Sequence, residues 1–199
     1  MPNGFITTYS GRRLYPANPT ADSISIADIA IGLSREARYA GHTRTVRAYT
    51  VAEHSVRCRR LADDDIALFV LMHDATEFAL KDCPKPIKDM LPAYQELEEK
   101  LNLVIAEKYG YLSQVMDENV AERLHHIDMT MAATEMRDFK GESYPHLPPP
   151  LTEKLGEPWT ENQAREEFLR EFYKLWPRTA QKSAAIKVAL GADGSVVDS

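Results

Sequence analysis

A histidine directly followed by an aspartate, His73-Asp74, closes an apolar run from Ile66 to Met72. Because such a run predicts a helix that is apolar all round, both polar side chains are expected at or near the protein core. A buried, ionised carboxylate costs free energy unless a cation or several hydrogen-bond donors compensate its charge. Coordination of one divalent metal ion by the imidazole and the carboxylate is a simple solution.

A second carboxylate, Glu77, follows four residues after His73 and three residues after Asp74. Residues at these spacings share a helix face, so the three ionisable groups are expected on one side of a single helix. The alternative is structural: Asp74 and Glu77 face solvent where the helix leaves the core. The trio alone leaves both interpretations open.

Two further residues favour the metal. His54 belongs to the preceding predicted helix, and the short connection between the two helices makes them antiparallel neighbours. Asp128 shares a face with the apolar Leu124 and Met131 of a later predicted helix, where a carboxylate again requires a cation. Two imidazoles and two carboxylates suit a divalent Mn, Co, Zn, Fe or Mg ion with positions left for water, as in catalytic sites. The predicted ligands of one such ion are His54, His73, Asp74 and Asp128.

The elements that would position these residues are helices. Apolar spacing and start signals predict helices over Ile26–Arg38, Val51 to about Leu61, Asp63–Asp65 to about Leu80, Pro92 to about Tyr109, about Asp117–Asp138 and about Glu161–Leu175. Thr50 and Glu53 predict a capping box, in which each side chain bonds the other residue's backbone amide. The sequence contains neither βαβ alternation nor a Gly-rich phosphate loop. The expected fold is an all-α helical bundle with a short irregular or β-ribbon N-terminal arm.

A chain of 199 residues suits one domain. Its expected parts are an N-terminal arm (1–25), a metal-site core (26–140), a Pro-rich connection (141–159), C-terminal helices (160–190) and a frayed tail (191–199). An apolar stripe along one predicted helix, which could face the core or a second copy of the chain, consists of Tyr94, Leu97, Leu101 and Val104.

The formal net charge of −6 argues against binding to nucleic acid polymers or anionic membranes, although it permits a local basic pocket for a small anion. The longest apolar run is too short to span a bilayer, and the first residues lack the features of a signal peptide. The two cysteines, Cys58 and Cys83, form no disulfide framework. A reducing, cytoplasmic setting is therefore expected.

The ordered set His54…His73-Asp74…Asp128 resembles the H…HD…D signature of the HD-domain phosphohydrolase superfamily. Longer strings are similar to its branch of bacterial 5′-deoxynucleotidases and phage-type nucleotide phosphohydrolases. These strings are Val51-Ala52-Glu53-His54-Ser55, His73-Asp74-Ala75-Thr76-Glu77 and Lys81-Asp82-Cys83-Pro84-Lys85-Pro86-Ile87-Lys88. The similarity covers about residues 8–138. An isolated HD dipeptide is a weak signal, whereas the ordered set with its flanking strings is specific.

The resemblance implies an HD-type bundle in which the four predicted ligands hold the metal. It also implies that Glu77 and Asp82 shape the reacting water and the substrate. Arg38 is expected at the phosphate, followed by Tyr39 where the branch usually has tryptophan. From the residues alone, several basic groups near the metal helices could hold a phosphate or could be ordinary solvated cations. Besides Arg38 these are His42, Arg44, Arg47, Lys85 and Lys88.

The expected chemistry is metal-assisted hydrolysis of a phosphate ester, with Asp74 at the metal and Glu77 moving the proton. The first expected substrate is a deoxynucleoside 5′-monophosphate, which would yield nucleoside and phosphate. One alternative is a deoxynucleoside triphosphate such as dATP, which would release triphosphate. Another is a catalytically silent HD-type binding module, although this chain retains all four ligands and Glu77. A homo-oligomer, with a dimer favoured, is expected because oligomers are common in the resembling branch.

Overall fold

The computed structural model describes residues 4–189, and it describes the side chains of residues 4–177. Over these residues the chain is mostly helical, with one antiparallel hairpin of β1 (Ile6–Thr7) and β2 (Arg13–Leu14) near the N-terminus. The predicted all-α class with a short N-terminal arm is therefore confirmed. None of the helices described is long and apolar enough to cross a membrane.

The α-helices are α1 (Ile26–Arg35), α2 (Val51–Leu61), α3 (Ala67–Met72), α4 (Glu77–Leu80), α5 (Lys85–Lys88), α6 (Pro92–Tyr109), α7 (Leu112–Val115), α8 (Glu118–Glu135) and α9 (Glu161–Ala189). Short 3-10 helices η1 (Ala21–Ser23) and η2 (Arg38–Gly41) precede α1 and α2, and a π-helical turn η3 (Met136–Lys140) follows α8. Side-chain oxygens cap the N-termini of three of the longer helices, because an unpaired backbone amide there needs an acceptor. The caps are Ser25, Thr50 and Asp117.

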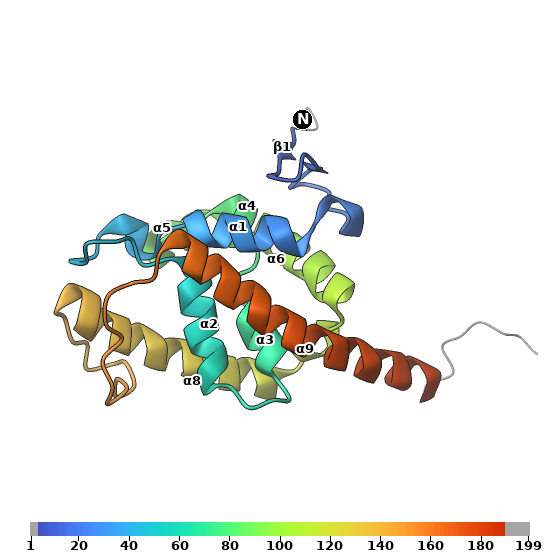
Figure 1. Ribbon diagram of the computed structural model, residues 1–199. Coiled ribbons are helices and arrows are strands. Elements are labelled where there is room, and N and C mark those ends of the chain that lie inside the picture. The colour runs from blue at the N-terminus through green and yellow to red at the C-terminus, as the bar shows by residue number, and fades with distance from the viewer. Residues whose placement is uncertain (1–3, 190–199) are drawn as a thin grey trace, which may run out of the picture.

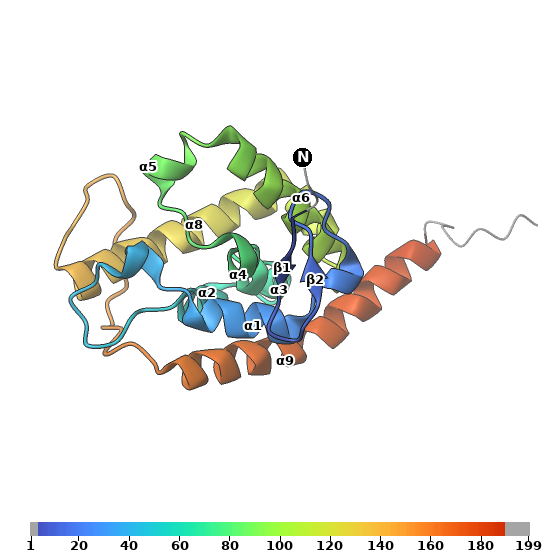
Figure 2. The same cartoon turned by 90° about the horizontal axis from the view of Figure 1, so that it is seen from above.

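Helices α2 and α3 form the centre of the bundle. Helix α9 packs across α1, α2 and α3, while α8 packs against α2 (Figure 1). Seen from above, α9 follows one edge of the molecule and α6 and α8 lie beyond α2 and α3 (Figure 2). Fully buried apolar side chains from α2, α3, α6 and α9 fill the space between them, among them Val56, Leu71, Leu101, Phe168 and Phe172. This core fixes α2, which carries His54, and α3, which ends directly before His73 and Asp74.

The N-terminal hairpin is tied to α1 by a buried carboxylate. Asp28 accepts hydrogen bonds from the backbone amide and the hydroxyl of Ser10 and from the hydroxyls of Thr8 and Ser25. Burial alone would raise the pKa of Asp28, but the hydrogen bonds outweigh it and lower the pKa below its usual value.

The stripe along α6 packs mainly inward. Leu101 is fully buried, Val104 packs against the core, and the Tyr94 hydroxyl donates to the backbone carbonyls of Leu80 and Lys81. These contacts favour the core-facing interpretation of the stripe at those positions.

Two predicted helix boundaries are wrong. Helix α1 ends at Arg35 and not at Arg38, because the chain turns extended at Glu36 and Ala37 forms a β-bridge with Thr50. The expected single helix through Leu80 is interrupted over residues 73–76, where amides bond carbonyls three residues back: Ala75 to Met72 at 2.9 Å and Glu77 to Asp74 at 3.0 Å. This tighter winding brings residues three apart into line, so Asp74 and Glu77 remain on the same side.

The C-terminal part also differs from the prediction. A single helix, α9, runs from Glu161 through Pro177 to Ala189, whereas one helix was predicted to end near Leu175 and more than one helix was expected over 160–190. The predicted frayed tail, residues 191–199, lies outside the described residues.

The capping box is only half formed. Thr50 accepts the amide of Glu53 at 3.3 Å, as predicted, but the Glu53 carboxylate does not reach back. It binds the Arg57 side chain and the backbone amide of Trp159, because the buried carboxylate finds a charged partner and a further donor there.

Candidate metal centre

The four predicted ligands meet between α2, α8 and the turn after α3. The Nε2 atom of His54 lies 3.3 Å from Nε2 of His73, 3.2 Å from Oδ1 of Asp128 and 3.7 Å from Oδ2 of Asp74. The Nε2 atom of His73 lies 3.2 Å from the same Asp74 oxygen. Both imidazoles and both carboxylates thus converge on one point.

The outer nitrogen of each imidazole already has a partner. Nδ1 of His54 lies 2.6 Å from Oε1 of Glu135, and Nδ1 of His73 lies 2.7 Å from the carbonyl oxygen of Val70. Both partners are acceptors, so each Nδ1 carries a proton, and a neutral ring then presents a lone pair at Nε2. Two lone pairs and two carboxylates face one another, which is unfavourable unless positive charge lies among them.

The spacing of these atoms fits a divalent ion. An ion with bonds of about 2.0–2.2 Å to nitrogen and oxygen separates neighbouring ligand atoms by roughly 2.8–3.6 Å. The separations of 3.2, 3.3 and 3.7 Å around His54 Nε2 lie in or next to this range. The sulfur of Cys58 also lies close: ligand atoms of His54, Cys58, His73 and Asp128 are all within 4.8 Å of one another. The described residues therefore include a group at metal-binding distance.

The electrostatic environment favours a positive charge at the point where the four predicted ligands meet. Burial and Arg38 would lower the pKa of His54, but Cys58, Glu135 and Asp128 outweigh them and raise it well above its usual value. Burial would also lower the pKa of His73, and Asp74 reverses that effect. The negative surroundings thus favour a cation at this point, whether protons or a metal ion, while the Asp74 and Asp128 side chains remain 20% and 27% exposed.

Glu135 is a site residue that the sequence reasoning missed. It is fully buried at the end of α8, seven residues and about two helical turns after Asp128, and so on a similar face. Its Oε1 accepts from His54 Nδ1 and from the Tyr49 hydroxyl at 2.8 Å. A carboxylate behind a ligating histidine fixes the ring orientation and makes the ring more basic. The signal in the sequence was the two-turn spacing from Asp128.

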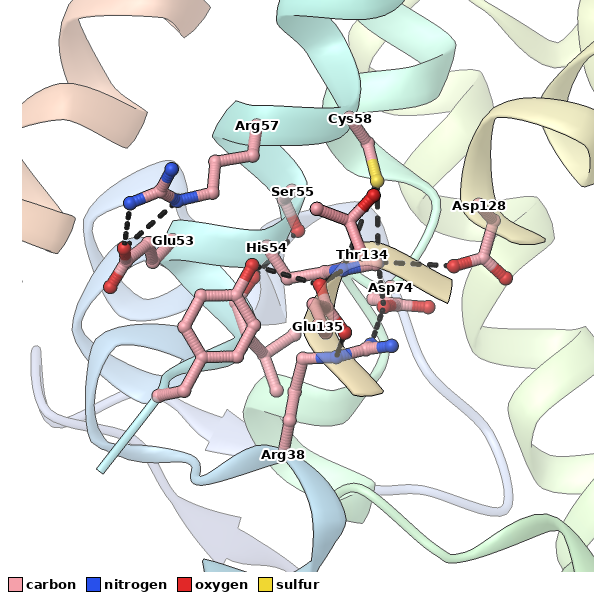
Figure 3. Close-up of polar contacts among 12 residues, drawn as sticks. Arg38, Glu53, His54, Ser55, Arg57, Cys58, Asp74, Asp128, Thr134 and Glu135 are labelled. Carbon is pink, nitrogen blue, oxygen red and sulfur yellow. Dashed lines mark hydrogen bonds and ion pairs between the residues drawn. The ribbon is translucent and has the colours of Figure 1, made fainter. Parts of the chain in front are cut away.

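The other oxygen of Glu135 binds the segment before α2. Oε2 accepts from the Tyr39 hydroxyl at 2.5 Å and from Nε of Arg38 at 3.3 Å. Burial alone would raise the pKa of Glu135, but Arg38 and His54 outweigh it and lower the pKa to about 2. The Glu135 carboxylate is thus ionised, and each of its two oxygens accepts two hydrogen bonds (Figure 3).

Arg38 bridges two carboxylates of the centre. Its Nε donates to Glu135, and its NH1 lies 3.3 Å from Oδ2 of Asp74. The two following residues, Tyr39 and Ala40, have positive φ angles of 58° and 51°. Residues other than glycine adopt such angles only at a cost in free energy. Asp82 lies near this turn, where burial raises the pKa of its carboxyl group against the lowering effects of the Arg38 side chain and the backbone amide of Tyr39.

Glu77 lies beside the centre without a partner. It is 5% exposed, and its Oε2 atom is buried with no hydrogen bond to any residue that the structure describes. Burial raises the pKa of Glu77, and the nearby Asp74 and Asp82 raise it further. A buried carboxyl group with a free oxygen can bind a water or hold a proton there.

The predicted substrate-binding residues are only partly brought together. Asp82 and Tyr39 lie at the Arg38 turn, and Lys88, whose Nζ binds Glu98 at 2.8 Å, lies close enough to lower the pKa of Glu77. Lys85 instead pairs with Asp89, and its side chain is 83% exposed. His42 lies on an exposed loop, and its hydrogen bonds to other described residues, Lys140 and Tyr39, are made by its backbone.

A cavity of about 290 Å³ lies against His73. Thr76, Gln95, Glu98 and Asn102 line it together with the His73 ring. This volume is near the lower end for small-molecule sites, which is about 300 Å³.

No family model matches the chain. The chain is 44% identical over 135 residues to the uncharacterized protein YfdR of Escherichia coli (strain K12), an alignment that covers 68% of this chain and 72% of that protein. It is 35% identical over 140 residues to the uncharacterized protein RCAP_rcc00048 of Rhodobacter capsulatus, covering 66% of this chain and 71% of the relative. Both names leave the activity open, so the functional argument depends on the site itself.

Proposed function

We propose that this chain, which belongs to the family of the Escherichia coli protein YfdR, is a metal-dependent phosphohydrolase that acts on nucleotides. The observation that carries the proposal is the meeting of two imidazole lone pairs and two carboxylates at one partly buried point, in the order of the H…HD…D signature. The unpaired Glu77 beside that point supports catalysis rather than a structural metal, because a structural site needs no free carboxyl group.

The metal would be held by His54, His73, Asp74 and Asp128. When bound, a divalent Mn, Co, Zn, Fe or Mg ion supplies Lewis-acid activation of water and of a phosphoryl oxygen. Glu135 holds the His54 ring in place through Nδ1, and the Val70 carbonyl does the same for His73.

Glu77 is the group that moves the proton. Its buried Oε2 is free to bond a water or the leaving oxygen, and its raised pKa suits a carboxyl group that carries a proton near neutral pH. In this assignment Glu77→Gln keeps metal binding and loses most of the turnover. Full activity in that variant would remove Glu77 from the mechanism.

Arg38 pairs with Asp74, and Lys88 lies close enough to Glu77 to lower its pKa; these two cations would neutralise the phosphate. The first substrate we propose is a deoxynucleoside 5′-monophosphate, cleaved to nucleoside and phosphate. Lys85 and His42 are left out of this assignment because the structure places them on exposed segments.

The experiment is to incubate the metal-loaded chain with dAMP and, separately, with dATP, and to assay phosphate and triphosphate. Phosphate from dAMP supports the monophosphatase, whereas triphosphate from dATP would make the chain a triphosphohydrolase. Asp128→Asn should abolish either reaction. Glu122→Gln, an exposed carboxylate on the same helix, is the matched control and should keep it. Absence of both products with every ion, from a folded and metal-loaded chain, would refute the proposed function.

A further inference from the structure

Cys58 is a chemically active group that the proposed reaction does not use. It lies on α2 one turn after His54 and is completely buried. Its Sγ atom lies 3.4 Å from Nε2 of His54, the nitrogen that faces the other ligands. Ligand atoms of Cys58, His54, His73 and Asp128 are all within 4.8 Å of one another. The sulfur therefore lies next to the same point as three of the four predicted ligands.

The sulfur and Asp74 approach that point from different directions. Figure 3 shows Cys58 above the His54 ring and Asp74 below it in the same view. Asp74 is not part of the tight group that contains the sulfur, although its Oδ2 lies 3.2 Å from His73 Nε2. His54, His73 and Asp128 are thus common to two possible ligand sets. Either Asp74 or Cys58 can supply the fourth ligand.

A buried cysteine is often only a small apolar side chain, and Cys58 does contact an apolar cluster formed with Ile66, Val70 and Met131. Its sulfur nevertheless has a polar neighbour in His54 Nε2, whose lone pair is the site of metal binding. In a tetrahedral centre with a sulfur bond of about 2.3 Å and a nitrogen bond of about 2.0–2.1 Å, the two ligand atoms are roughly 3.5 Å apart. The observed 3.4 Å matches this separation, but the same sulfur lies 3.8 Å from Nδ1 and so beside the ring; to act as a ligand, the Cys58 side chain must turn toward the lone pair of Nε2.

We propose that Cys58 supplies a thiolate ligand when the centre holds a soft, tetrahedral ion such as Zn(II) or Co(II), together with His54, His73 and Asp128. Asp74 instead completes an oxygen-richer set for Mn(II) or Mg(II), because thiolate favours soft ions and carboxylate favours hard ones. On sulfur binding, the S–H bond breaks, the sulfur–metal bond forms and the proton passes to solvent. This inference rests on the metal centre of the proposed function and concerns which ion that centre prefers.

The first test is cobalt absorption of the full chain after chelator treatment. One equivalent of Co(II) should give the d–d bands of a tetrahedral ion and a near-ultraviolet sulfur-to-cobalt charge-transfer band. Cys58→Ser should keep the d–d bands and lose the charge-transfer band. Cys83→Ser is the matched control, because Cys83 is the other free cysteine of the described chain and lies in the loop after α4; it should keep both.

The second test needs no change at Cys58. X-ray absorption of the zinc-loaded Cys83→Ser protein should contain one sulfur neighbour at about 2.3 Å beside nitrogen and oxygen at about 2.0–2.1 Å. Titration should also show that Cys58→Ser weakens zinc binding by at least about tenfold relative to manganese, since only the soft ion loses a preferred ligand.

The outcomes separate this inference from the proposed function. If cobalt binds with one-to-one stoichiometry but without a charge-transfer band, and zinc has only nitrogen and oxygen neighbours, Cys58 is not a ligand and the phosphohydrolase proposal stands. If neither cobalt nor manganese binds to the folded chain, the metal centre itself is wrong, and both proposals fall.

Discussion

Replacing Glu135 by glutamine should weaken both the fold and the metal centre. The carboxylate accepts four hydrogen bonds, from His54 Nδ1, the hydroxyls of Tyr49 and Tyr39, and Nε of Arg38. A glutamine amide keeps one acceptor oxygen, but its NH₂ group meets donors at the positions of the second oxygen. Among the described residues, the substitution also leaves Asp74 as the one remaining ion-pair partner of the buried Arg38.

The magnitude follows from these contacts. Removal of one member of a buried ion pair costs about 3–5 kcal/mol of unfolding free energy. Loss of the carboxylate behind a ligating histidine lowers metal affinity by about 10–100-fold. We therefore expect Glu135→Gln to lower the free energy of unfolding of the metal-free chain by about 3 kcal/mol or more. Manganese affinity, measured by calorimetry at a temperature where the variant is folded, should fall at least about tenfold.

Tyr49→Phe is the matched control for this prediction. It removes one hydrogen bond to the same carboxylate oxygen as His54 and leaves the ion pair intact, so it should cost about 1 kcal/mol. Its manganese affinity should stay within about twofold of the original, because the bond to His54 Nδ1 remains. If Glu135→Gln binds manganese as tightly as Tyr49→Phe does, Glu135 does not orient the ligand and the reasoning is refuted.

Three further results are expected. Gly32→Ala places a Cβ atom 2.8 Å from Cβ and 2.9 Å from Cα of Phe78, so α4 must shift. The free energy of unfolding should fall by about 1–3 kcal/mol, and turnover should fall through the adjacent Glu77. Gly4→Ala, whose new Cβ has no atom within 4 Å, should be neutral in both unfolding and kinetic assays. Asp28→Asn should destabilise the chain at neutral pH. Because the folded-state pKa of Asp28 is lowered, its stabilising contribution exists above the unfolded-state pKa of about 3.9 and disappears as the pH falls through the folded-state pKa. A difference in denaturant midpoint that does not change with pH would contradict this prediction. Manganese at about 100 times its dissociation constant should stabilise the chain by about 2.7 kcal/mol, and a stability that neither manganese nor a chelator changes would argue against a metal centre.

The helical class and the long helices could be predicted because their signals are local. The capping residue Thr50 and the apolar spacing of α2 depend on neighbours within a few residues, and α2 begins and ends as predicted. The end of α1 could not be predicted in this way. It depends on the bridge between Ala37 and Thr50 and on the strained turn at Tyr39, which contacts from distant segments impose.

The candidate ligands could be found because unpaired charges in apolar helices are costly, and His54, His73 and Asp128 do converge. Glu135 was missed because its two-turn spacing from Asp128 indicates only a shared helix face, whereas its role depends on a contact with His54, 81 positions away. Lys85 was expected at the substrate because it follows the metal helix closely in the sequence. In the structure it pairs with Asp89 and faces solvent, because a new helix, α5, begins after the turn at Pro84.

The central claim is that the buried meeting point of His54, His73, Asp74 and Asp128 is a catalytic metal centre. The most direct measurement is phosphate release from dAMP by the chelator-treated chain before and after addition of one equivalent of manganese, with Asp128→Asn in parallel. Our account predicts no release before addition, release after addition, and none from Asp128→Asn. Release that persists after chelation, or that Asp128→Asn retains, would contradict it.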